Sequence, residues 1–137
     1  MITNLHLKIA PRRLIKSNDE EIWSRVISVI DKDGRFLDRF QLMCAAIDAD
    51  LQSAEGSGAD FLRGIQQIES GEKDRIDADG NAWIAIITRD KVWFESLYSQ
   101  GEGGEVSLAQ YKLAVQTYVS FLADPESKPI EVPFPDE

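Results

Sequence analysis

Two runs of β-prone residues near the middle of the chain constrain its fold more than any other feature. They occupy positions 83–87 and 92–94, and four polar residues separate them. Two such runs with a short polar linker are typical of an antiparallel hairpin. Both faces of the first run are apolar, which predicts a central strand with helices on one side and Trp93 or the tail on the other. A chain of 137 residues can enclose such a hairpin in one domain.

The N-terminal segment predicts a further strand over residues 3–9. Leu5, Leu7 and Ile9 alternate with polar residues, which is the period of a half-buried strand. Because proline cannot donate to a sheet ladder, Pro11 is expected to end this strand.

The next segment fits two structures. Ser17 and Asn18 resemble helix N-caps, and apolar residues at helical spacing follow, so a helix over 19–31 is predicted. The same residues are rich in β-branched side chains, so a hairpin turning at Asp33-Gly34 is the alternative.

Apolar periodicity predicts three further helices. One covers residues 36–53, and a shorter one begins at a cap formed by Ser57 with Asp60 and ends at Gly71. The last helix begins after its cap Ser107 and ends before Pro125. Between them, residues 72–80 are expected to form a loop or a short edge strand, and residues 100–104 a loop.

These elements predict an α+β fold. We expect one domain over residues 1–124, in which a small antiparallel sheet, made of the N-terminal strand and the hairpin, packs with about four helices. Residues 125–137 are rich in proline and acidic side chains and are expected to be extended or weakly ordered.

Catalytic and metal-binding motifs are scarce. The single cysteine, Cys44, falls in an apolar stripe, and the single histidine, His6, lacks an assignable partner. Acidic runs at 31–34 and 74–80 lack the ligand set of a calcium loop. Carboxylate pairs such as Asp48 with Asp50, or Glu102 with Glu105, are expected by chance among 24 acids. We therefore expect no catalytic residue, no cofactor and no metal.

Charge is distributed unevenly along the chain. Residues 1–16 carry four basic side chains and no acid, whereas the whole chain has a net charge of −9. The remainder is therefore strongly anionic, which disfavours nucleic acid and anionic membranes and favours a basic protein partner. The first sixteen residues lack the apolar core of a signal peptide, and no apolar run is long enough to span a membrane, so a cytoplasmic protein is expected.

The order of elements and several short segments resemble a known family. The segments are Phe61-Leu62-Arg63-Gly64-Ile65 with Gly71-Glu72, then Gly80-Asn81-Ala82-Trp83, and finally Val106-Ser107-Leu108-Ala109-Gln110-Tyr111 with Val119-Ser120-Phe121-Leu122. Over about half of the chain, they resemble small bacterial immunity proteins of contact-dependent growth inhibition and other polymorphic toxin systems. The resemblance implies a non-catalytic protein that neutralises a cognate toxin domain by direct binding.

Electrostatics suggests where such a toxin would bind. An inhibitor of a nuclease-like toxin needs an anionic surface that pairs with the lysines and arginines of the toxin, together with an aromatic anchor. The candidate partner-binding residues are Glu69, Glu72, Asp74, Asp77, Asp79, Asp90, Trp93, Glu95, Glu102 and Glu105. Two alternatives stay open: a homodimer built on Trp93 and the edge of the hairpin, and a small enzyme that uses paired carboxylates in a pocket.

Overall fold

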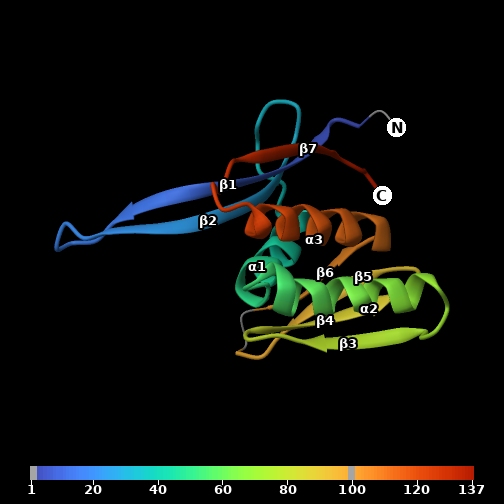
Figure 1. The fold of residues 1–137 in the computed structure, drawn as a ribbon. Coiled ribbons are helices and arrows are strands. Elements are labelled where there is room, and N and C mark those ends of the chain that lie inside the picture. The colour runs from blue at the N-terminus through green and yellow to red at the C-terminus, as the bar shows by residue number, and fades with distance from the viewer. Residues whose placement is uncertain (1–2, 99–100) are drawn as a thin grey trace.

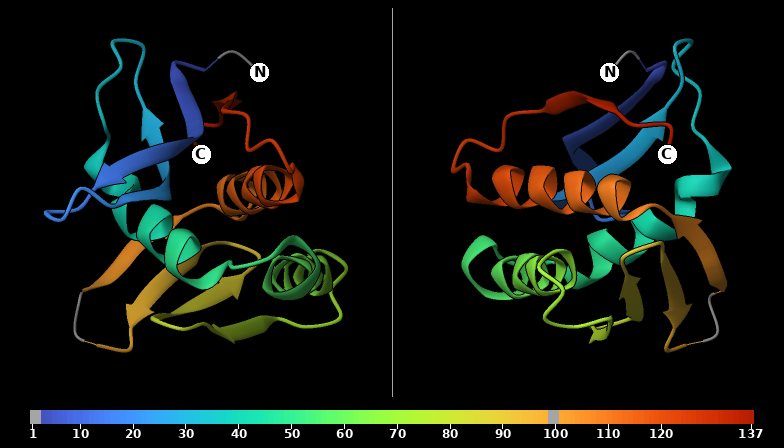
Figure 2. Two further views of the ribbon diagram at one scale, coloured as in Figure 1. Left: turned by 60° about the vertical axis from the view of Figure 1, so that its left-hand side comes forward. Right: turned by 90° about the vertical axis from the view of Figure 1, so that its right-hand side faces the viewer.

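Three α-helices lie between two antiparallel sheets in the computed structural model, which describes residues 3–98 and 101–137 (Figure 1, Figure 2). The first sheet has the strand order β2-β1-β7, and the second has the order β3-β4-β5-β6. The predicted α+β class is confirmed. The prediction of one sheet with about four helices is wrong, because the N-terminal strand and the central hairpin belong to different sheets. Helices placed between two sheets cover an apolar face of each.

The first sheet is built on a long N-terminal hairpin. Strand β1 (Leu5–Ile15) pairs with β2 (Glu21–Ile30) along its whole length, and with β7 (Ile130–Phe134) only from Leu5 to Ile9. Pro11 therefore does not end the strand as predicted. It lies beyond the β1–β7 ladder, where that edge of β1 is open and a missing N–H breaks no ladder.

The helix predicted over 19–31 is wrong, because these residues form β2. Their β-branched side chains fit a strand as well as a helix, and pairing with β1 decides between the two. The expected cap residues form the hairpin turn instead, where Asn18 accepts a hydrogen bond from the Glu20 N–H at 3.1 Å. The alternative prediction, a hairpin that turns at Asp33-Gly34, is correct that these residues form a strand. The chain does turn at Gly34, but beyond that turn only Phe36 bridges to Ile30.

The first two helices are shorter than the apolar periodicity predicts, whereas the last one has the predicted bounds to within one residue. A 3-10 turn, η1 (Asp38–Phe40), precedes α1 (Gln41–Asp50), and a π-helical turn, η2 (Ala54–Gly58), precedes α2 (Ala59–Glu69). Helix α3 (Leu108–Ala123) begins with a capping box, in which Ser107 and Gln110 each accept a hydrogen bond from the other's backbone N–H.

The second sheet contains the predicted hairpin. Strands β4 (Trp83–Thr88) and β5 (Val92–Ser96) form it, and β3 (Arg75–Asp79) is the edge strand expected within 72–80. The loop predicted over 100–104 is wrong from residue 102 onward, because β6 (Glu102–Val106) pairs with β5; Gln100 lies outside the described residues. Gly104 has a φ of 65°, and a side chain on it would collide with Leu42 of α1. Both strands of the hairpin are therefore interior, with β3 on one side and β6 on the other.

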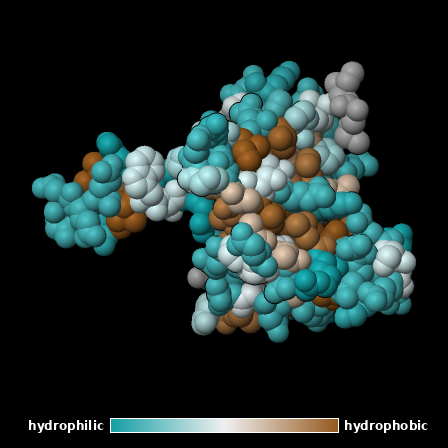
Figure 3. All heavy atoms as spheres, in the orientation of Figure 1, coloured by the Kyte–Doolittle hydropathy of each residue, from teal (hydrophilic) through white to brown (hydrophobic). Residues whose placement is uncertain are grey.

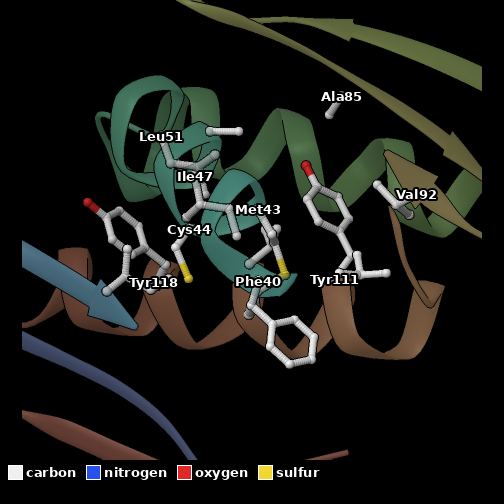
Figure 4. Packing of buried hydrophobic residues seen from close by; sticks show 14 of the residues in the cluster. Phe40, Met43, Cys44, Ile47, Leu51, Ala85, Val92, Tyr111 and Tyr118 are labelled. Atoms are coloured by element: carbon white, nitrogen blue, oxygen red, sulfur yellow. The ribbon is translucent and has the colours of Figure 1, made fainter. Parts of the chain in front are cut away.

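The core connects both sheets to the helices. Tyr111 and Tyr118 of α3 pack beside Met43 and Ile47 of α1, as Figure 4 shows. The C-terminal segment contributes Phe134, which is fully buried and meets Phe40 edge to face with ring centroids 5.3 Å apart. The tail is thus extended, and its strand β7 belongs to the first sheet.

Candidate functional site

The second sheet has one face that the helices do not cover. Ile76 and Ala78 of β3 pack against the core, so the alternating residues Arg75, Asp77 and Asp79 lie on the opposite side. We call this opposite side the outer face. Through the strand register, it continues across β4, β5 and β6.

Three candidate acids form a line across the outer face. Asp79 pairs with Ile84, Ile84 pairs with Glu95, and Glu95 pairs with Glu102, so Asp79, Glu95 and Glu102 occupy one row perpendicular to the strands. All three are exposed. Among the ion pairs of the described residues, none includes a member of this acidic row. Glu95 and Glu102 are directly opposed like charges and repel each other, and the charge of Arg75 acts on Glu95 and offsets part of this repulsion.

Three other candidate residues on this face, Asp77, Trp93 and Glu105, already contact a cation of this chain. The guanidinium of Arg75 lies 5.6 Å from the Trp93 ring centroid, and the ammonium of Lys91 lies 5.0 Å from it. Arg75 also pairs with Asp77 at 2.7 Å, which lowers the pKa of that carboxyl, and Lys91 pairs with Glu105 at 3.1 Å. Trp93 lies opposite Ile86, which is only 1% exposed. Trp93 is therefore half-buried cover for the sheet, held by two cations.

The four remaining candidates lie elsewhere. Glu69 ends α2 and pairs with Lys112 of α3 at 2.9 Å. Glu72 and Asp74 precede β3, and Asp90 lies in the β4–β5 turn, at the end of the sheet away from the acidic row. The ten predicted residues thus divide into the acidic row, a neutralised Trp93 cluster and scattered acids.

The carboxylates of Asp48 and Asp50 have separate structural roles. Asp50 is buried at the end of α1 and accepts a hydrogen bond from the Ala82 N–H at 2.9 Å. Burial raises the pKa of Asp50, and hydrogen bonds from the backbone of the β3–β4 turn oppose that shift. Asp48 accepts a hydrogen bond from the Tyr118 hydroxyl at 2.9 Å. An open hollow of about 600 Å³ includes Asp50 in its lining, but this carboxylate is occupied by turn amides.

The other chemically active side chains are isolated from one another. Burial raises the pKa of Cys44 to about 12, which keeps its thiol protonated. His6 lies 3.9 Å from Glu131 across the β1–β7 ladder. Within residues 3–98 and 101–137, no group of three or more histidines, cysteines and acids could hold a metal ion.

A second surface feature was missed by sequence reasoning. The end of the N-terminal hairpin, residues 10–25, projects from the body as a two-stranded arm (Figure 1, Figure 3). Ile15 and Trp23 of this arm are 64% and 65% exposed. The predicted helix over 19–31 would have placed Trp23 on its buried stripe. For this reason the sequence did not predict a projecting arm with an exposed Trp23.

The arm borders a hollow on the body. Its volume is about 630 Å³, and its lining includes Pro11, Trp23 and Arg25 from the arm, together with Phe121 and Leu122 at the end of α3. Asp48 and Glu126 add two carboxylates to this arm hollow.

Comparison with known proteins returned no match for this chain: no protein family, no curated protein and no solved structure matches it. No helix in the described part of the chain is long and apolar enough to cross a membrane.

Proposed function

We propose that this chain is a non-catalytic immunity protein that binds and neutralises a cognate, basic, nuclease-like toxin domain. The observation that carries the proposal is the acidic row, Asp79, Glu95 and Glu102, on the uncovered face of the second sheet. The resemblance of residues 59–123 to immunity proteins supports the same reading.

The acidic row has the properties that recognition of a basic surface requires. A rigid sheet holds Glu95 and Glu102 on neighbouring strands, about 4.8 Å apart. Asp79 lies two strands from Glu95, with Ile84 between them. Such a row concentrates negative charge on one face of the sheet, and it attracts a cationic partner over long range. Ile84, half-buried between Asp79 and Glu95, adds an apolar centre to the row.

Trp93 contributes less than the sequence predicts. Because Arg75 and Lys91 flank its ring, Trp93 is positioned as sheet cover, and the cations beside it would repel a basic toxin. We therefore place the toxin contact on the acidic row, which borders the Trp93 cluster at Glu95.

Finding the partner is the first step of the test. The immobilised chain is exposed to lysate of its own organism, and proteins released by high salt are identified by mass spectrometry. The toxin domain so identified is then purified, and its affinity for the chain and its activity in the presence of the chain are measured.

Two matched triple variants locate the contact. Asp79→Lys, Glu95→Lys and Glu102→Lys together reverse the acidic row, whereas Glu72→Lys, Asp74→Lys and Asp90→Lys make the same change in net charge elsewhere. We expect the row variant to weaken toxin binding by about 100-fold or more and the control variant by less than about fivefold. Equal losses in both variants would reduce the effect to overall charge and would contradict the assignment of the row.

A further inference from the structure

We propose that the arm pairs face to face with the arm of a second copy of this chain, the tip of each arm filling the arm hollow of the other. The proposal does not rest on the toxin-binding function, since the arm belongs to the first sheet and the acidic row to the second.

The arm lacks the support that strands ordinarily need. Beyond Ile9, β1 pairs with β2 alone, because β7 stops at the Ile9–Ile130 pair. An isolated two-stranded hairpin is marginally stable in water, and this one exposes Ile15 and Trp23. A surface that covers these two side chains would stabilise the arm.

One face of the arm continues the buried face of the sheet. Ile9 and Ile27 are paired and buried, so the next pairs on the same face are Pro11–Arg25, Arg13–Trp23 and Ile15–Glu21, in order from the body to the tip. We call this side the core-side face; the arm hollow lies against its first two pairs.

The core-side face is complementary to itself. A two-fold axis through the middle pair lays two arms antiparallel, so that the Pro11–Arg25 pair of one copy meets the Ile15–Glu21 pair of the other. Apolar Pro11 then faces Ile15, and the Arg25 cation faces the Glu21 carboxylate. Each interaction occurs twice in the dimer.

The middle pair lies on the axis. Trp23 of each copy meets Trp23 of the other, which covers a large apolar side chain that is otherwise in water. Arg13 also meets its counterpart, but each Arg13 is already paired with Glu21 of its own chain at 3.2 Å. Glu21 is thus shared between Arg13 of its own chain and Arg25 of the other copy.

The two-fold axis places Ile15 of one copy at the arm hollow of the other, and the lining of this hollow is partly apolar. Ile15 enters beside Pro11 and against Phe121 and Leu122, and the hollow of about 630 Å³ has room for its side chain. Glu126 on the hollow rim is paired with Lys128 at 3.0 Å, and Lys16 of the entering tip is paired with Glu20 at 3.6 Å, so the dimer brings two existing ion pairs together. The second copy is therefore favoured over an unrelated partner, because one two-fold axis covers Ile15 and Trp23 of both chains and brings each Arg25 to a Glu21.

The test compares two apolar residues on opposite faces of the same arm. Ile15 lies on the core-side face, and its neighbour Leu14, 38% exposed, lies on the other. Sedimentation equilibrium of the whole chain is expected to give twice the 15.4 kDa chain mass at high micromolar concentration. Ile15→Lys is expected to raise the dissociation constant of the dimer by about 30-fold or more, and Leu14→Lys by less than about threefold.

Far-UV circular dichroism checks that both variants keep the fold, which is expected because both side chains are near the exposed tip. A monomer at all concentrations would overturn the proposal and would indicate that the arm binds a different protein. A dimer that Ile15→Lys does not weaken, or that both variants weaken equally, would overturn the assignment of the core-side face.

Discussion

The hydroxyl of Tyr118 donates a hydrogen bond to Asp48 at 2.9 Å, and the guanidinium of Arg25 lies 5.7 Å from the centroid of the same ring. This contact joins α3, α1 and β2, so the root of the arm is attached to two helices. The core therefore holds the arm at its base, although its tip has no support from the body.

Tyr118→Phe removes the hydroxyl and leaves the ring in place. We expect a loss of about 1 kcal/mol in the free energy of unfolding, since the partly exposed Asp48 regains water. Urea unfolding measures the loss, with Tyr98→Phe as the control because Tyr98 is 68% exposed. Equal stability of Tyr118→Phe and the unmodified chain would show that this hydrogen bond contributes nothing.

The buried tyrosines predict a loss of stability in alkali. Burial raises the pKa of both Tyr111 and Tyr118 above the ordinary value of 10.0. The folded state therefore holds these protons more tightly than the unfolded state, and stability falls as the pH rises above about 10. Urea midpoints between pH 8 and pH 11.5 test this, and Tyr118→Phe should make the decline shallower. A midpoint that stays constant over this range would contradict the prediction.

Asp50→Ala should be among the more harmful substitutions of an acid. It leaves the half-buried Ala82 N–H without its acceptor, at a cost of about 2 kcal/mol. Asp74→Ala, in an exposed loop, serves as the control and should change stability by less than about 0.5 kcal/mol. Similar urea midpoints for the two variants would show that Asp50 does not hold the β3–β4 turn.

Glu102→Lys should separate stability from binding. It replaces the repulsion between Glu95 and Glu102 with attraction, so stability should increase by about 0.5 kcal/mol, while toxin binding weakens. Glu105→Lys is the matched control, because it breaks the pair with Lys91 and should not raise stability. Thermal unfolding together with toxin affinity gives both readouts, and stronger toxin binding by Glu102→Lys would contradict the proposed contact.

Cys44 should be inert in the folded protein. Burial and a pKa of about 12 leave almost no accessible thiolate at pH 8. An aromatic disulfide reagent is expected to label the chain only after unfolding in urea. Rapid labelling of the native chain would show that α1 opens away from β2.

Local sequence patterns were sufficient to predict secondary structure where all residues of a segment favour the same structure. The runs at 83–88 and 92–96 have strand-forming residues and a short polar turn, and α3 has a capping box and a wide apolar stripe, so both were predictable. The sequence also identified Asp79, Glu95 and Glu102 as candidate acids for partner binding. The sequence did not show that these three acids share one row, because that depends on the register between the strands.

What the sequence by itself determined is the α+β class, the central hairpin, the capped last helix and the excess of negative charge. Only the tertiary structure decided the state of residues 21–30, whose apolar spacing suits a helix and whose β-branching suits a strand, because pairing with β1 supplies the backbone hydrogen bonds. It also decided the split into two sheets, the place of Phe134 in the core and the separation of the acidic row from the neutralised acids. These depend on contacts between residues far apart in the chain, which no local pattern of side chains encodes.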